Sequence, residues 1–235
     1  MGTILNIDVY GLRARINCPH EEDGREVARL LAFFLKNDIE EVDATLDFKR
    51  KETPQEIGGL LFPHLSRKGI WAIHSGGFHF HGGYLTIGPS DCGKSTFSHA
   101  AMKNGLFILS DDITLMKDCA DGVEMLPFYS TMYLKDKMIV PEPHLFQPAT
   151  LKVLLMPRSN NGSISLKKID KKIDILRRMV PQLLWSYNGN EQKKQKQFLE
   201  RMCDYPAYEV YWGPELFQDD SVFRNILDEI MQSEG

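Results

Sequence analysis

The chain has 235 residues, of which 43 % are hydrophobic and 26 % are charged. This length and composition predict one large or two small globular domains with a substantial core, and they exclude a disordered chain. The formal net charge of −4 offers no overall cationic field to a nucleic-acid backbone. Nucleic acid is therefore not an expected partner, and any polyanion must bind at a local site.

Neither the first residues nor the apolar runs indicate export or membrane insertion. Residues 1–8 lack the basic and then apolar segments of a signal peptide, and the longest apolar run, residues 30–35, is far too short to span a bilayer. The four cysteines are scattered and form no C-x-x-C pair, which favours reduced thiols. We therefore expect a cytoplasmic protein with no membrane partner.

The first third of the chain has a β-rich pattern. Residues 4–10 and 12–16 alternate apolar and polar side chains around Gly11, which predicts two strands with one wet face. Apolar residues at helical spacing predict a helix over residues 25–35, and residues 42–48 return to the period of a strand. Residues 54–61 could open a short helix that two glycines loosen.

The middle of the chain predicts strand, loop, helix and strand in close succession. Residues 78–80 and 84–87 form the arms of a predicted β-hairpin, and the second arm leads into a glycine-containing loop. A helix is expected after Ser95, ending at Asn104 and Gly105, and a strand over residues 106–109 follows.

The carboxyl-terminal half has weaker signals. Residues 127–148 are expected to be rich in loops, and residues 151–155 to form one more strand. An apolar stripe from Leu166 to Leu183, with basic residues facing away from it, predicts a basic helix. Residues 220–231 repeat that helical pattern. No linker divides the chain convincingly, so we expect a single domain.

Residues 88–95 match the pattern G-x-x-x-x-G-K-[ST], which marks a phosphate-binding loop when a strand precedes it and a helix follows. The backbone N–H groups are expected to surround the β-phosphate, Lys94 to contact the β- and γ-oxygens, and Ser95 to bind Mg²⁺. A plain glycine turn is the alternative. The predicted nucleotide-binding residues are Gly88, Pro89, Ser90, Asp91, Cys92, Gly93, Lys94, Ser95 and Thr96.

Two adjacent carboxylates, Asp111 and Asp112, follow the apolar residues 106–109. The end of a strand beside the loop is where a metal that bridges two phosphates finds a carboxylate ligand. Because the two side chains point in different directions, one can bind the metal while the other takes a proton from an acceptor hydroxyl. The pattern leaves open which of them is the base, and a solvated turn is the other interpretation.

Residues 74–112 resemble the catalytic core of the HPr kinase/phosphorylase family. The likeness rests on a histidine ahead of the strand, the loop GPSDCGKST, a helix that ends in Asn-Gly, and the segment FILSDD. It implies a mixed-sheet α/β fold related to that of phosphoenolpyruvate carboxykinases, with a tendency to assemble as a homo-oligomer. It also implies Asp111 as the catalytic acid/base, Asp112 as a metal ligand with Ser95, and His74 close to the phosphates.

This resemblance implies one domain with three parts and a kinase activity that uses ATP and Mg²⁺. The parts are a β-rich segment over residues 1–69, a P-loop catalytic core over 70–157 and a helical part over 158–235. Thr96 stands where full-length members carry a glutamate, and residues 125–131 replace the signature associated with dephosphorylation and with holding HPr. We therefore expect a kinase without phosphorylase activity, whose acceptor is a serine-type hydroxyl on a peptide or small protein other than HPr.

Two further functions stay open at this point. A kinase of the same fold could phosphorylate a small metabolite, which predicts a closed pocket beside Asp111 in place of an open groove. A nucleotide-binding regulator could switch a partner without any phosphoryl transfer.

Three further features each have more than one interpretation. Cys92 could be an oxidation-sensitive thiol or a small residue that fits the loop. The basic residues between Lys167 and Arg178, together with Lys193, Lys194 and Lys196, could dock an acidic peptide or a second phosphate, or face solvent. Tyr205, Tyr208, Tyr211 and Trp212 could line an acceptor pocket or pack in the core or in an interface.

Overall fold

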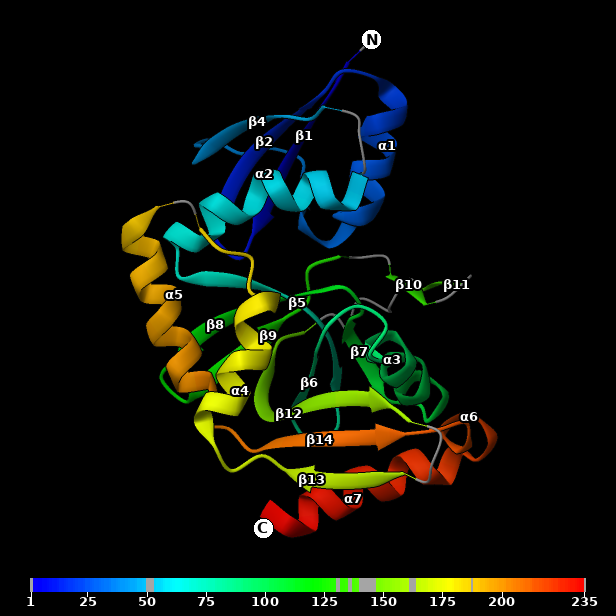
Figure 1. Ribbon diagram of the computed structural model, residues 1–235. Coiled ribbons are helices and arrows are strands. Elements are labelled where there is room, and N and C mark those ends of the chain that lie inside the picture. Colours follow the sequence, from blue (N-terminus) through cyan, green and yellow to red (C-terminus); the bar gives the residue numbers. More distant parts are fainter. Residues whose placement is uncertain are drawn as a thin grey trace.

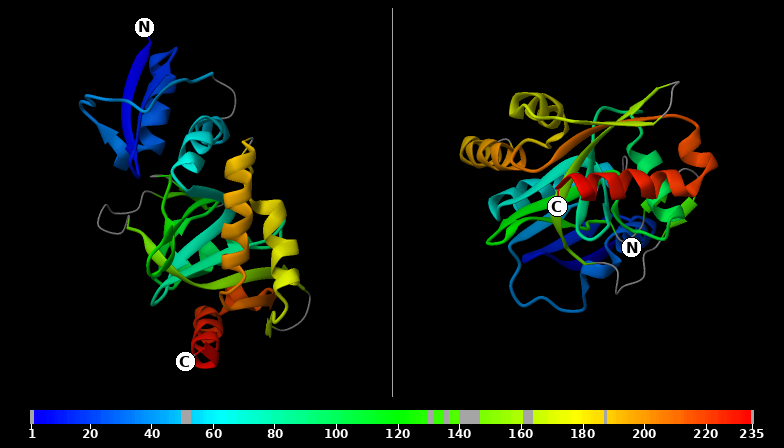
Figure 2. Two further views of the ribbon diagram at one scale, coloured as in Figure 1. Left: turned by 90° about the vertical axis from the view of Figure 1, so that its left-hand side faces the viewer. Right: turned by 90° about the horizontal axis from the view of Figure 1, so that it is seen from below.

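A computed structural model describes residues 2–49, 53–129, 132–134, 137–139, 147–160, 164–186 and 188–234. It is a mixed α/β protein in which an amino-terminal four-stranded sheet lies at one end and the carboxyl-terminal helix at the other (Figures 1 and 2). A larger eight-stranded sheet lies between them. The predicted α/β class is confirmed.

The amino-terminal sheet has the strand order β3-β1-β2-β4. A tight turn at Tyr10 and Gly11, both with positive φ, joins its two longest strands, as expected for a two-residue hairpin. The predicted helix over residues 25–35 begins earlier and ends at Leu30, where a short 3₁₀ turn takes over. The elements are β1 Thr3–Val9, β2 Leu12–Cys18, α1 Glu21–Leu30, η1 Ala32–Phe34, β3 Leu35–Lys36 and β4 Ala44–Asp47.

Helix α2, Thr53–Arg67, is longer than the short helix that the glycines suggested. Its apolar residues Ile57, Leu61 and Leu65 are fully buried, so packing outweighs the intrinsic cost of two glycines in a helix. One hydrophobic cluster joins these side chains to the amino-terminal sheet and to Ile70 and Leu115 of the larger sheet. The amino-terminal part and the larger sheet therefore share a core.

The larger sheet is organised around the long strand β5, Ile70–His79. The first half of β5 pairs with β8, and its second half pairs with β6 and β7. Because β8 pairs with β9, β9 with β12 and β12 with β6, the pairings close a circuit around the strands. The other strands of this circuit are β6 Gly83–Ile87, β8 Ile113–Cys119, β9 Gly122–Leu126 and β12 Ala149–Ser159, while β7 Phe107–Ser110 pairs with β5 outside the circuit.

Helices cover both faces of the parallel strands β6, β12 and β14. Successive side chains of a strand point to opposite faces of the sheet. Leu85 therefore packs in one hydrophobic cluster with α4 and α5, and Tyr84 packs in another cluster with α3 and α7. Figure 2 shows α4 and α5 side by side and α7 apart from them. The elements are α3 Lys94–Lys103, β13 Ser165–Lys168, α4 Lys172–Met179, η3 Val180–Gln182, α5 Gly189–Met202, β14 Ala207–Trp212, α6 Glu215–Gln218 and α7 Asp220–Glu234.

The single basic helix expected over residues 166–183 is wrong. Residues 165–168 form the edge strand β13, which pairs with β14, and the helix begins only at Lys172. Ile173 and Val180, both expected on the apolar stripe, are exposed. The basic side chains are not one continuous face either, since Lys168 pairs with Glu234 and Lys172 with Asp204.

Other elements were not predicted. Strands β8 and β9 lie in a stretch for which no element was expected. Within residues 127–148, expected as loop, β10 Met132–Leu134 pairs with β11 Lys137–Ile139, while residues 130–131, 135–136 and 140–146 lie outside the described residues. The part over 158–235 is not purely helical, because β13 and β14 belong to the larger sheet. The carboxyl-terminal helix is confirmed as α7. Within the described ranges, no helix combines the length and the apolar character needed to cross a bilayer.

Candidate functional site

The loop over residues 88–93 joins β6 to α3, so the strand–loop–helix context required by the motif is present. Asp91 and Gly93 have φ of 62° and 115°, while Cys92 between them has negative φ. Alternation of right- and left-handed residues can turn successive backbone N–H groups towards one side and make a concave anion site, although the Cys92 N–H donates to the Pro89 carbonyl oxygen at 3.4 Å. The loop also ends at the amino terminus of α3, whose first turn contains no acidic residue. Its free N–H groups and positive dipole end are available to an anion.

Two glycines of the loop have no room for a side chain. A Cβ on Gly93 would lie 2.5 Å from Trp212 Nε1, and one on Gly88 would lie 2.6 Å from Cys92 Sγ. Trp212 stands at the end of β14 and donates a hydrogen bond from its indole nitrogen to the Cys92 carbonyl oxygen at 3.1 Å. Trp212, which the sequence placed in an acceptor pocket or in the core, therefore contacts the phosphate-binding loop.

Replacing Gly93 by alanine is expected to lower the free energy of unfolding more than replacing Gly105. Both have positive φ, but only a side chain at Gly93 would meet another group, whereas a Cβ on Gly105 would have no atom within 4 Å. Backbone strain alone costs about 1–2 kcal/mol, and the contact with Trp212 adds about 1–3 kcal/mol. Thermal unfolding of Gly93→Ala and Gly105→Ala measures the difference. Adding Trp212→Ala should recover part of the loss only in Gly93→Ala; equal effects of the two single variants would contradict the contact.

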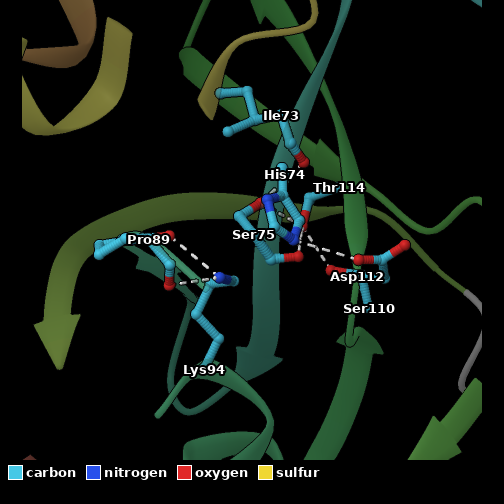
Figure 3. Close-up of polar contacts among 9 residues, drawn as sticks. Ile73, His74, Ser75, Pro89, Lys94, Ser110, Asp112 and Thr114 are labelled. Carbon is cyan, nitrogen blue, oxygen red and sulfur yellow. Dashed lines mark hydrogen bonds and ion pairs between the residues drawn. The ribbon is translucent and has the colours of Figure 1, made fainter. Parts of the chain in front are cut away.

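The Lys94 side chain is buried, at 7 % exposure. Its Nζ donates hydrogen bonds to the carbonyl oxygens of Gly88 and Pro89, each at 3.0 Å, so the ammonium group folds back over its own loop (Figure 3). A buried ammonium needs such partners because removing its hydration is costly. This geometry fits a cation that can exchange two carbonyl partners for phosphate oxygens.

Asp111 lies between β7 and β8 and is half-buried, whereas Asp112 is exposed. Its Oδ1 atom has no hydrogen-bond partner among the described residues. Burial raises the pKa of Asp111 to about 6 from its usual 3.8, and the nearby charge of Asp112 adds to the increase. The hydroxyls of Ser98 and Ser95 act in the opposite direction. The charge of Lys94 also lowers this pKa, so the carboxyl group and the loop lysine are close enough to interact.

Asp112 and His74 form a second pair beside Asp111. His74 Nε2 lies 3.2 Å from Asp112 Oδ1, and the Ser75 N–H donates to the Asp112 carbonyl oxygen at 3.0 Å (Figure 3). Because His74 is on β5, which pairs with β8, the sheet register brings the two residues together. The register thus places His74 on β5 between the loop that follows β6 and the aspartates that precede β8.

Buried hydroxyls support this site, and no motif of the sequence pointed to them. Ser75, Ser110 and Thr114 are buried and hydrogen-bonded to one another, with 2.9 Å between Ser75 Oγ and Thr114 Oγ1. A Cβ on Gly76 would lie 2.6 Å from Thr86 Oγ1, so this glycine makes space for a hydroxyl. The small residues at 75–77, inside an otherwise apolar strand, were a signal that sequence analysis did not use.

The remaining predicted loop residues differ in exposure. Pro89, Ser90, Asp91 and Ser95 are exposed, and Thr96 and Cys92 are half-buried. Burial raises the pKa of the Cys92 thiol, and this outweighs the nearby Lys94 charge and backbone hydrogen bonds that lower it. The thiol is therefore not activated by the helix terminus, which favours the interpretation of Cys92 as a small residue that fits.

A cavity of about 460 Å³ adjoins the outer side of the loop and the end of β12. Arg158 and Arg178 line it, and both pair with the buried Glu209; Arg158 Nε lies 2.9 Å from Glu209 Oε1. Burial alone would raise the pKa of Glu209, but Arg178 and Arg158 lower it overall. The acidic residue thus fixes two cations beside the loop.

The residues between the loop and the acidic pair also fit a divalent ion that prefers oxygen ligands. Ser95 and the two aspartates offer hydroxyl and carboxylate oxygens, which suit Mg²⁺. In the part of the chain that the structure describes, no group of three or more His, Cys, Asp or Glu side chains could hold a metal ion alone. Mg²⁺ usually keeps several waters and shares substrate phosphates, so a small protein contribution is compatible with it.

No protein-family model matches the chain, and no curated protein matches it in sequence. Among solved structures, the chain is similar to the Hpr(Ser) kinase/phosphatase from Coxiella burnetii, with 12 % sequence identity and a TM-score of 0.40. The likeness covers 70 % of this chain and 99 % of that one. It is a distant likeness to the family that the motifs resemble, and by itself it carries no conclusion about activity.

Proposed function

We propose that this protein is an ATP- and Mg²⁺-dependent kinase that transfers a phosphoryl group to a serine-type hydroxyl on a peptide or small protein. One observation carries the proposal. Two ionisable side chains come close enough for their charges to interact: Lys94 of the loop, which is buried, and the half-buried Asp111, which follows β7 and whose Oδ1 is buried. Burying both groups is costly for a purely structural site, and phosphoryl transfer uses both.

The loop would hold the phosphates. The N–H groups of the concave loop and of the first turn of α3 donate to the β-phosphate, and Lys94 exchanges the carbonyl oxygens of Gly88 and Pro89 for β- and γ-oxygens. We place the nucleoside in the cavity of about 460 Å³ beside Arg158. Mg²⁺ bound at Ser95 and Asp112 would neutralise charge on the phosphates.

Asp111 would act as the general base. The acceptor oxygen attacks the γ-phosphorus as its proton moves to the Asp111 carboxylate, a new O–P bond forms, and the bond from phosphorus to the β–γ bridging oxygen breaks to release ADP. A carboxyl group with a pKa of about 6 is mostly charged at neutral pH and is a stronger base than an ordinary aspartate.

One observation favours the exchanged assignment of the two aspartates. Asp112 is paired with His74 and lines a cavity separate from the one beside the loop, while the hydroxyl of Ser95, the expected metal ligand, is close enough to Asp111 to lower its pKa. In that case Asp112 takes the proton and Asp111 holds the metal with Ser95. Substituting the two aspartates separately distinguishes these assignments, as set out in the Discussion.

The overall activity is tested by incubating the protein with γ-labelled ATP, Mg²⁺ and a library of serine-containing peptides, while calorimetry measures binding of Mg²⁺–ATP. Label on serine and Mg²⁺-dependent nucleotide binding are expected. A protein that binds no nucleotide would contradict the proposal, and a protein that labels only small metabolites would move the acceptor to the other class.

The pH dependence of transfer should follow Asp111. Because the base must be charged and its pKa is raised to about 6, kcat/KM is expected to fall about tenfold per pH unit below pH 6 and to level off above it. An ordinary aspartate would keep its activity down to about pH 4. Initial rates between pH 4.5 and 8.5 at saturating Mg²⁺ measure the curve, and the same scan with Asp111→Asn should lack the acidic limb.

A further inference from the structure

A second cavity, of about 480 Å³, opens beside the His74–Asp112 pair. Helix α2 forms one wall with Gly59 and Phe62, and residues 184–186 form the other, with His74 and Asp112 between them. The second wall is fixed to β5, because the Leu184 N–H donates to the Ala72 carbonyl oxygen at 3.0 Å and Leu183 bridges to Ile73. The space lies within the volume range of small-molecule and side-chain pockets.

The chemistry of the lining restricts what can bind. The walls are mainly apolar, while polar groups of the candidate transfer site stand between them. Among the described residues that line this cavity there is no lysine or arginine, and His74 already pairs with Asp112, so a phosphorylated or carboxylate metabolite would find no permanent cation to pair with. Leu184 and Trp185 are each 37 % exposed, which indicates that the apolar wall continues to solvent at the mouth.

We infer that this cavity binds an apolar side chain of a polypeptide acceptor, next to the residue whose hydroxyl receives the phosphoryl group. The inference rests on the proposed function and specifies its substrate class. An open apolar mouth suits a side chain whose backbone continues outside, whereas a small metabolite is better retained by an enclosed site. The apolar side chain fills the space between Phe62 and Trp185, and the neighbouring hydroxyl then lies towards Asp112 and the aspartate beside it.

Gly59 provides a direct way to fill the cavity. It lies in α2, its φ is not in the left-handed region, and a Cβ there would meet nothing within 4 Å. Leucine at this position should therefore occupy part of the cavity without disturbing the helix. Alanine is the matched control, because it brings the same gain in helix propensity and almost no volume.

The experiment compares two fluorescein-labelled peptides, in which a serine is followed either by phenylalanine or by glycine. Transfer from Mg²⁺–ATP gives kcat/KM for each. Fluorescence anisotropy of the same two peptides, with alanine in place of the serine, measures their affinity for the protein in the absence of nucleotide and of any reaction. The wild-type protein is expected to prefer the phenylalanine peptide roughly tenfold or more in both measurements.

Variants then locate that preference. Gly59→Leu and Trp185→Ala should each reduce binding of the phenylalanine peptide roughly tenfold, whereas Gly59→Ala should leave it unchanged. Ile4→Ala, at a residue 63 % exposed on β1, is the control for the tryptophan variant. Far-ultraviolet circular dichroism confirms that each variant is folded.

The outcomes separate this inference from the proposed function. Equal binding of the two peptides, no binding of either, or a Gly59→Leu variant that binds like Gly59→Ala each overturns the inference. Loss of Mg²⁺–ATP binding in the wild-type protein would instead remove the kinase activity. The anisotropy measurement needs no nucleotide, so it still decides whether the cavity takes an apolar side chain.

Discussion

Asp111→Asn is expected to lower kcat for phosphoryl transfer by roughly 10²–10⁴-fold and to leave the affinity for Mg²⁺–ATP within about threefold of wild type. The amide keeps the shape of the side chain but cannot take the acceptor proton. Steady-state rates with a serine-containing acceptor peptide and calorimetric nucleotide binding measure the two effects. The neighbouring Asp112→Asn is the matched comparison, and as a metal ligand it should mainly raise the Mg²⁺ concentration needed for half-maximal rate.

The opposite pattern would exchange the roles of the two aspartates. In that case Asp111→Asn raises the Mg²⁺ requirement and Asp112→Asn abolishes the transfer. If Asp111→Asn and Asp112→Asn both keep full biological function while nucleotide binding stays essential, the protein is a nucleotide-binding regulator and the kinase proposal is wrong.

The same Asp111→Asn variant should be more stable than wild type at pH 7.5. The folded-state pKa of about 6 lies above the usual 3.8, so the stabilising contribution of Asp111 is full below about pH 4 and is lost as pH rises through 6. About two pKa units correspond to about 3 kcal/mol at most, and partial exposure reduces this to about 1–2 kcal/mol. Thermal unfolding should show a difference that shrinks as the pH falls to 4; a less stable variant at pH 7.5 would contradict the burial argument.

Lys94→Met is expected to abolish detectable nucleotide binding, with an affinity loss of at least about 10²-fold and a comparable loss of kcat. Methionine fills a similar volume but carries no charge, and it also leaves the carbonyl oxygens of Gly88 and Pro89 without their donor. Calorimetry with Mg²⁺–ATP measures the binding. The control is Lys103→Met, which removes an exposed lysine from the last turn of the same helix.

Stability separates the two consequences of removing Lys94. The buried ammonium costs desolvation, and the unpaired carbonyl oxygens cost about 1–3 kcal/mol when it is removed, so the net change in the free energy of unfolding is expected to be small. A Lys94→Met protein that is folded and still binds Mg²⁺–ATP as tightly as Lys103→Met would show that the loop does not hold phosphates.

Local patterns predicted most of the segment around the candidate site. The hairpin, the glycine loop and the helix ending at Asn104 depend on neighbours in sequence, so residues 78–110 were largely correct as elements. His74 and Asp112 also came from motifs, although their 3.2 Å contact depends on the pairing of β5 with β8.

The carboxyl-terminal half could not be derived in the same way because tertiary pairing decides it. The periodicity of residues 165–168 predicts a helix. They form the edge strand β13 because strand β14 offers them backbone hydrogen-bond partners. Strand β14 is itself nearly all buried, and a short apolar run gives no period that separates helix from strand. The contact between Trp212 and the loop joins residues 120 positions apart, which no local pattern encodes.

The position of Trp212 has a consequence for when a growing chain becomes able to bind nucleotide. All residues of the motifs have been synthesised once the chain reaches position 112. The indole that donates to the Cys92 carbonyl oxygen is added about a hundred residues later. A nascent chain that stops before β14 thus carries the whole motif without the strand that clamps it. Binding of nucleotide during synthesis is expected to begin only once residue 212 has emerged and β14 has paired with β12.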